Sequence, residues 1–148
     1  MAKDPYKDNL GPRAVFARKV VVGARLVVVL DGGMPMRGLE LIVQGTRGVE
    51  TGQIHELIGT IEDGTGPGSV VNRINYLGFI EIGNGGLLCE GDELHVDGRL
   101  VGYLAGFDYT HMPNHMNIVI RVAAPHSGLE RGFELGQTVQ FKLASAPV

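Results

Sequence analysis

The stretch Gly91–Val122, GDELHVDGRLVGYLAGFDYTHMPNHMNIVIRV, decides the fold that the sequence predicts. Within it, Glu93–Val96 alternates polar and apolar residues with the period of two that is typical of a strand. Asp97 and Gly98 are a favoured pair for a type I′ turn, and strand pattern resumes over Arg99–Phe107. We therefore expect a β-hairpin that runs into a polar turn and leaves it through another apolar strand.

The rest of the chain indicates further short strands. Glycine accounts for 23 of the 148 residues, more than twice its usual share of about 7%. These glycines are not periodic, and they separate short runs of Val, Ile and Leu, as turns between strands do. Val70–Asn75 is the exception, since Ser69 is a suitable N-cap for a short helix there. The predicted fold is all-β: a small single-domain β-barrel or sandwich of about eight to ten short strands.

The domain organisation follows from length and local composition. A chain of 148 residues fits one domain that buries roughly two thirds of its unfolded surface without a disulfide or a metal. Residues 1–13 carry several charges, two prolines and one glycine, with little apolar surface to bury. We expect a flexible N-terminal arm over residues 1–13 and a single β-barrel-like domain over residues 14–148.

Charge and cysteine content exclude several classes of protein. The net charge is −3 and no cluster of Lys or Arg occurs, which argues against a nucleic-acid partner. The single cysteine, Cys89, cannot form an internal disulfide and is typical of a reducing compartment, where we expect it to be a packed core thiol. The sequence has no apolar span of 18 residues and no apolar segment near its N-terminus. We expect a cytoplasmic protein without membrane contact.

Most groups able to do chemistry gather in the polar turn. Its candidate residues are Asp108, Tyr109, Thr110, His111, Asn114, His115 and Asn117. Asp, Thr and Asn also close turns through hydrogen bonds from their side chains to the backbone, which is the structural alternative. We favour a functional site because turn closure alone does not require two histidines and a tyrosine.

The expected catalytic set is His111, His115, Asp108 and Tyr109. Histidine is the usual acid/base near neutral pH, so His111 or His115 would transfer the proton. Asp108 would orient that histidine, and Tyr109 would hydrogen-bond a substrate oxygen. A divalent metal held by His111, His115 and Asp108 is the alternative, but Pro113 disfavours the helix on which this spacing would converge. We expect no cofactor.

The expected substrate-binding set is Asn114, Asn117, Arg121 and His55. The two amides would bind substrate oxygens, and Arg121 would pair with a carboxylate if it shared their face. His55 would reach the interior if its segment is a strand, where a hydrogen-bonded structural histidine is the alternative. The glycine-rich loop Gly64–Ser69 is a further candidate, because its backbone N–H groups would suit an anion.

The order of features in the C-terminal half carries a resemblance to a known family. The features are a hairpin opened by Gly91 and Asp92, strand pattern over Val101–Phe107, Asn114 and His115 before an apolar strand, and Arg121–Pro125 before the closing strand Gln137–Leu143. In this order the chain resembles the glucitol/sorbitol-specific IIA component of the sugar phosphotransferase system. The resemblance implies a small cytoplasmic β-rich phosphocarrier in which His55 accepts the phosphoryl group.

The function that we expect is a small enzyme or enzyme subunit. It would act on a small polar metabolite by histidine-centred acid/base chemistry, in an isomerase, lyase or hydrolase step. The alternatives are a IIA-like phosphocarrier or sugar-binding protein that uses His55, and a non-catalytic binding or assembly module. We also expect a homo-oligomer, because the apolar segment Arg25–Leu30 would promote aggregation at an exposed sheet edge.

Overall fold

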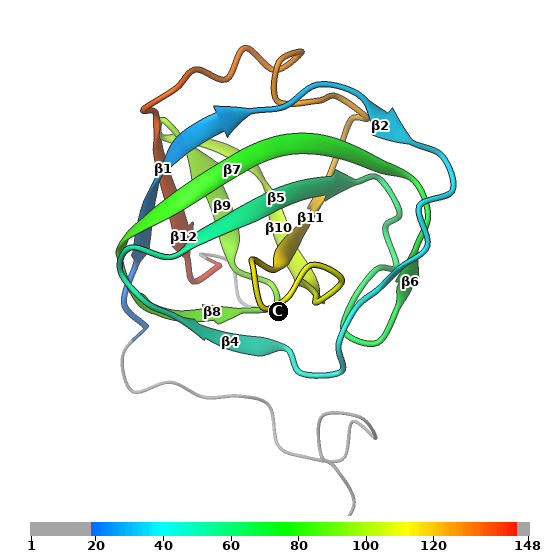
Figure 1. The fold of residues 1–148 in the computed structure, drawn as a ribbon, viewed down its shortest axis with the longest axis horizontal. Helices are drawn as coiled ribbons and strands as arrows, with labels where there is room; N and C mark the ends of the chain where they lie inside the picture. The colour runs from blue at the N-terminus through cyan, green and yellow to red at the C-terminus, as the bar shows by residue number, and fades with distance from the viewer. Residues whose placement is uncertain (1–18, 145–148) are drawn as a thin grey trace, which may run out of the picture.

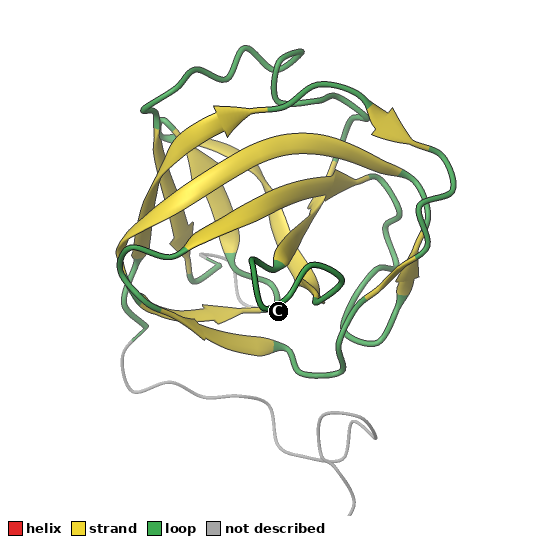
Figure 2. Ribbon diagram, viewed as in Figure 1, coloured by secondary structure: helices red, strands yellow, loops and turns green. Residues whose placement is uncertain are grey.

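The computed structural model describes residues 19–144, which form strands and turns but no helix (Figure 2). No helix that could span a membrane therefore occurs among these residues. The expected arm at 1–13 lies outside the described part of the chain. The strands are β1 (Val22–Val29), β2 (Gly33–Met34), β3 (Leu39–Glu40), β4 (Thr46–Val49), β5 (Ile54–Thr60), β6 (Val70–Val71), β7 (Ile74–Asn84), β8 (Gly86–Cys89), β9 (Glu93–Val96), β10 (Arg99–Asp108), β11 (Asn117–Val122) and β12 (Thr138–Lys142).

Seven of these strands close into a barrel (Figure 1). The order around the barrel is β1-β12-β9-β10-β11-β5-β7, and β7 pairs again with β1. Neighbouring strands are antiparallel, except that β11 and β5 run parallel. The all-β prediction and its barrel form are therefore confirmed. β1 pairs with β7 over Gly23–Val29 but with β12 only over Val22–Arg25, so most of Arg25–Leu30 has a strand partner on one side, and the homo-oligomer stays a prediction.

The hairpin that organised the prediction is present. Its strands β9 and β10 pair as expected, with Arg99 opposite Val96. Asp97 and Gly98 both have positive φ angles, 52° and 80°, which a type I′ turn requires. β10 then runs from this hairpin to Asp108, so it joins the turn at one end of the barrel to the polar segment at the other.

The helix expected at Val70–Asn75 is absent, and that prediction is wrong. Val70–Val71 forms β6, which pairs with β3, and Ile74 begins the long strand β7. Val71 and Ile74 are both buried, so packing of an extended segment outweighs the local helix signal. Ser69 does not cap a helix; its Oγ accepts a hydrogen bond from the Gly66 backbone N–H at 3.0 Å.

Two apolar cores explain why some strands are buried on both faces. The larger core fills the barrel, and the smaller one lies outside it, where β3 and β6 cover neighbouring strands. In β5, Leu57 belongs to the inner core and Ile58 to the outer core. In β11, Ile118 and Val119 divide in the same way. The polar segment Asp108–Asn117 connects the end of β10 to the start of β11, which is one of these strands.

Candidate active site at the Asp108–Asn117 turn

Three polar side chains lie in one row across the outer face of the barrel. Asp108 is paired with Asn117 between the antiparallel strands β10 and β11, and Asn117 is paired with Glu56 between the parallel strands β11 and β5. Paired residues of neighbouring strands point to the same face of a sheet. Phe107 and Leu57, which alternate with this row, lie in the inner core. Strand register therefore brings together Asp108, Asn117 and Glu56, and all three are buried.

Asp108 organises the turn itself. Its Oδ2 accepts hydrogen bonds from the Asn117 side-chain amide at 2.9 Å and from the Thr110 backbone N–H at 3.2 Å. Its Oδ1 accepts a third hydrogen bond from the Thr110 hydroxyl at 2.9 Å. These bonds are the turn-closing contacts that the sequence left open as an alternative. They involve neither His111 nor His115, so Asp108 positions the turn as a whole.

The turn places His115 beside Glu56. The distance between His115 Nε2 and Glu56 Oε1 is 3.4 Å, although the angle does not meet hydrogen-bond criteria. The His115 ring also contacts the edge of Phe79, with the ring centroids 5.1 Å apart. On its other side, Nδ1 lies 3.2 Å from the Asn114 side-chain nitrogen. If the Asn114 amide donates to Nδ1, Nε2 is the protonated nitrogen of the neutral ring and lies near Glu56 without a hydrogen bond to it.

Burial raises the pKa of Glu56 above its ordinary value, and the negative charge of Asp108 acts in the same direction. The charges of His111 and Arg37 lower that pKa and so oppose the shift. His111 is exposed, and its ring lies on that of His115 with 5.1 Å between centroids. The site is therefore a buried carboxyl group with two imidazoles arranged outward from it.

Glu56 is a candidate site residue that the sequence did not single out. The only signal for it in the sequence is that Glu56 is the one carboxylate in the mostly apolar segment Ile54–Ile61, next to His55. What the sequence could not show is that β5 runs parallel to β11 and pairs Glu56 with Asn117.

His55 lies on the inner side of β5 and is buried. Its Nδ1 accepts a hydrogen bond from the Met116 backbone N–H at 3.1 Å, and its Nε2 lies 3.2 Å from Gln53 Oε1. Burial first, then the charges of Arg47 and His115, lowers the pKa of His55 to about 4. His55 is thus a neutral histidine with both nitrogens engaged, and phosphoryl transfer to it would require one of these bonds to break.

Polar atoms without a partner concentrate at this site. Among the described residues, four buried side-chain atoms lack a hydrogen bond, and three of them are Arg47 Nε, His115 Nε2 and Asn117 Oδ1. Arg47 also lies over the ring of Tyr109, 5.7 Å from its centroid. Buried polar groups are nearly always paired in folded proteins, so these three atoms are the ones available to contact a ligand or an ordered water.

Arg121 is not part of the turn site. Its Nη1 donates to the Thr65 carbonyl at 2.9 Å and so anchors the glycine-rich loop instead. The N–H groups of that loop are used within the protein: Thr65 donates to Glu62, and Gly68 donates to Ile42. The loop therefore offers no open cradle of N–H groups for an anion.

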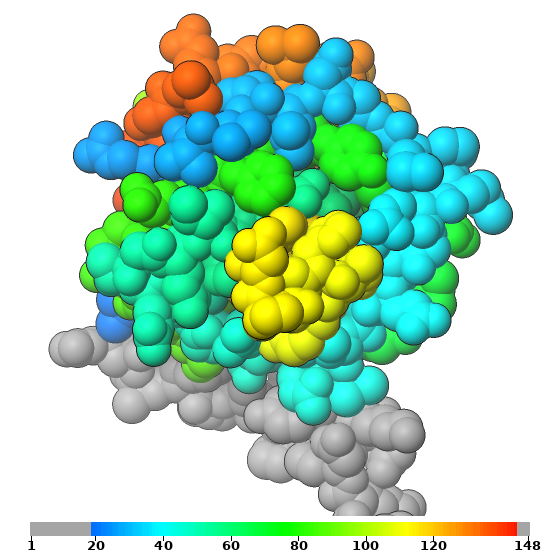
Figure 3. Space-filling view, viewed as in Figure 1, coloured from blue at the N-terminus to red at the C-terminus, as the bar shows by residue number. Residues whose placement is uncertain are grey.

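The two histidines and Asp108 do not converge on a common point. No group of three or more His, Cys, Asp or Glu side chains in residues 19–144 is arranged to hold a metal ion. Figure 3 shows the turn as a compact patch (yellow) that closes over this face of the barrel. Asn114 and Tyr109 are exposed on the patch, whereas Glu56 is buried beneath it.

Comparison with known proteins places the chain in a family. Residues 16–142 match the model of a family of unknown function, DUF6917, and the chain belongs to that family. No curated protein and no solved structure matches the chain significantly.

Proposed function

We propose that the protein catalyses proton transfer on a small polar metabolite, with Glu56 and His115 as the acid/base pair. The observation that carries this proposal is the 3.4 Å approach of His115 Nε2 to a buried carboxyl group whose pKa is raised. A raised pKa brings a carboxyl group closer to the neutral range in which it can both hold and release a proton. The reaction would be of the isomerase or lyase type.

The pair suits a step in which one proton leaves the substrate and another returns. A substrate beside Glu56 and His115 can lose a proton to one group and gain a proton from the other. Arg47 Nε would donate to a substrate oxygen, and Asn117 Oδ1 would accept from a substrate hydroxyl, since both atoms are buried without a partner. These requirements favour a substrate that carries hydroxyl and carbonyl or carboxylate oxygens.

Access to the pair requires the turn to move. Glu56 and Asn117 are covered in the closed form, with relative exposures of 7% and 1%. Loop movements of this kind open and close many active sites and exclude water during the reaction. Thr110 and Asp108 would hold the turn closed through the hydrogen bonds between them.

A solvent-exchange assay tests the proposal. The protein is incubated in D₂O with a panel of hydroxy acids, keto acids and sugars, and loss of carbon-bound protons is followed by ¹H NMR. We expect exchange on at least one compound class, and we expect Glu56→Gln and His115→Gln to reduce the rate at least about 100-fold, as loss of a general acid/base does.

Matched controls are Glu81→Gln and His126→Gln, which alter exposed residues of the same types. Both controls should exchange at the wild-type rate. Equal rates in Glu56→Gln and wild type would contradict the assignment of Glu56, and absence of exchange across the whole panel would contradict the proposed chemistry.

A further inference from the structure

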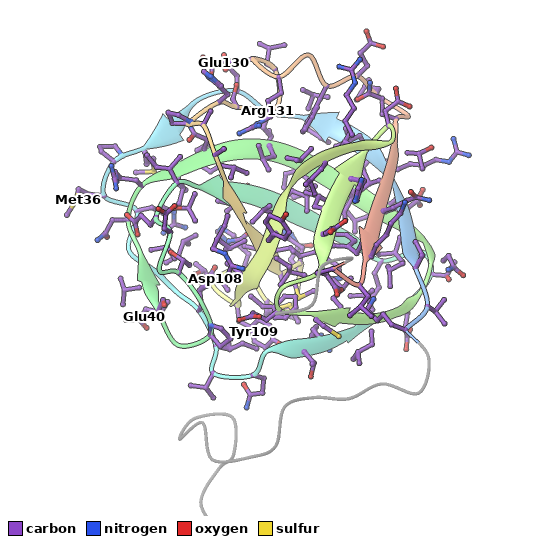
Figure 4. All side chains as sticks on the ribbon, turned by 180° about the vertical axis from the view of Figure 1, so that it is seen from behind. Met36, Glu40, Asp108, Tyr109, Glu130 and Arg131 are labelled. Atoms are coloured by element: carbon purple, nitrogen blue, oxygen red, sulfur yellow. The ribbon has the colours of Figure 1, made fainter. Side chains whose placement is uncertain are left out.

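A second feature of the molecule lies at the opposite end of β10 from the turn. There, the β9–β10 hairpin and the segment 131–137 line a half-open cavity of about 340 Å³. Cavities that bind small molecules are of this size or larger, typically about 300–1,000 Å³. Figure 4 shows the separation: Glu130 and Arg131 lie near one end of the molecule, and Asp108 and Tyr109 near the other.

Two arginines line this cavity. Arg131 donates from Nη2 to the Ala124 carbonyl at 2.7 Å and from Nε to the His126 carbonyl at 3.0 Å. Its guanidinium is half-buried, and neither Arg131 nor the exposed Arg99 forms an ion pair within residues 19–144. The charge of the neighbouring Glu130 also acts on Arg131, but no carboxylate among the described residues lies within ion-pair distance of either guanidinium, so both favour an anion in the cavity.

The charge balance of the lining limits the charge of a ligand. Arg99 and Arg131 contribute two positive charges, and Asp97, which also lines the cavity, contributes one negative charge. The lining therefore carries a net charge of one positive, which Glu130 next to Arg131 offsets in part from outside the lining, so it favours an anion with a single negative charge. A doubly charged phosphate would exceed it and would approach Asp97 as well.

The rest of the lining indicates what that ligand carries besides its charge. Leu100, Val101 and Phe133 supply apolar surface to the same cavity. Leu100 is 50% exposed although it lies within a strand, so an apolar ligand would cover surface that the fold leaves in contact with water. We propose that this cavity binds a small organic monoanion, a carboxylate on an apolar chain or ring.

In this assignment the carboxylate contacts Arg99 and Arg131, and the apolar part contacts Leu100 and Phe133. Arg131 holds the segment after β11 through its carbonyl contacts, so it fixes one wall of the cavity before the ligand arrives. Arg99 is exposed and begins β10, so its side chain closes on the carboxylate from the hairpin side. None of the residues that line this cavity belongs to the proposed proton-transfer site, so the two proposals can be tested separately.

Titration with hexanoate, followed by ¹H–¹⁵N NMR of the full chain, tests this site. We expect saturable shifts at the amides of Leu100 and Phe133, weaker binding of acetate, and no binding of hexylamine, which has the same chain and the opposite charge. Arg99→Gln should weaken hexanoate binding at least about fivefold, as loss of one charge-assisted contact does.

Arg25→Gln is the matched control, because Arg25 is exposed on β1 and does not line the cavity. It should bind hexanoate as the wild type does. Leu100→Ser provides a second arm: it should weaken hexanoate binding and leave acetate binding unchanged. The proposal is overturned if hexylamine binds as well as hexanoate, if Arg25→Gln and Arg99→Gln have equal effects, or if Leu100 and Phe133 show no saturable shift.

Discussion

His55 and Glu56 are neighbours in sequence on opposite sides of β5, and burial moves their pKa values in opposite directions. The pKa of His55 falls to about 4, and that of Glu56 rises above its ordinary value. The cause is the same in both, because burial disfavours the charged form of any group. For His55 this yields a neutral structural ring, and for Glu56 it yields a carboxyl group that releases its proton less readily than an exposed glutamate does.

His55 should make folding stability depend on pH on the acid side. Its pKa is about 6.5 when unfolded and about 4 when folded, so as pH falls between these values only the unfolded chain takes up the proton. His55 in its neutral form contributes roughly 3 kcal/mol to the free energy of unfolding. This contribution is fully present above pH 6.5 and is lost as the pH falls toward 4. Urea unfolding of wild type and His55→Asn over this range measures it.

His126→Asn serves as the control, because His126 is exposed and His55 is not. The control should keep the wild-type loss of stability on acidification, whereas His55→Asn should show a flatter profile. Parallel profiles for wild type and His55→Asn would contradict the neutral, buried assignment.

The residue types of the turn suggested a candidate site in the sequence but not which side chains meet there. The sequence pointed to Asp108 as the partner of a histidine, yet its three hydrogen bonds go to Thr110 and Asn117. Glu56 was missed because its neighbours in space come from a strand far along the chain. The local sequence shows which polar side chains are present, but only the pairing of the strands shows which of them lie close together.

At the scale of elements, prediction was most accurate where local signals were strongest. The β9–β10 hairpin has an Asp-Gly turn pair that fixes its geometry, and it formed as expected. Val70–Asn75 had only a cap signal and became extended, because Val71 and Ile74 pack into the outer core. The sequence left open whether the segment of His55 is a strand, because β5 is buried on both faces and shows no regular alternation of polar and apolar residues.

Truncations in β5 should reveal its two buried faces. Leu57 and Ile58 point to opposite faces but are 0% and 1% exposed, so Leu57→Ala and Ile58→Ala should each cost about 2–5 kcal/mol. Ile54→Ala, in the same strand at 45% exposure, should cost less than about 1 kcal/mol. Denaturant unfolding of the three variants measures these costs, and a small effect at Ile58 would contradict the outer core.

At the scale of the whole molecule, closure of the barrel depends on pairings between distant segments. β1 pairs with β7 and β12, and the parallel pair of β5 and β11 brings Glu56 to Asn117. The sequence indicated many strands and a barrel or sandwich, but it held no local signal for strand order. The position of the candidate site at one end of the barrel therefore came from the structure alone.

Gly78 lies where β7 pairs with β1 and closes the barrel, a position called the seam below, and a side chain there should destabilise the fold. A Cβ added there would collide with the Val28 carbonyl oxygen and press on Leu26. Gly78→Ala should therefore destabilise the fold by about 1–3 kcal/mol, as overpacking does. Gly48→Ala in β4, where an added Cβ meets no atom within 4 Å, is the control and should change stability by less than about 1 kcal/mol. Equal thermal stability of the two variants would contradict a closed seam.

The central claim is that Glu56 is a buried acid beneath the turn, in contact with His115. Titration of the Glu56 side-chain carboxyl by ¹³C NMR tests it without a known substrate, and Glu56→Gln identifies the resonance. We predict a midpoint clearly above the ordinary glutamate value of about 4.3, with the His115 ring resonances responding to the same titration. A midpoint at or below that ordinary value, with no response in His115, would contradict the claim.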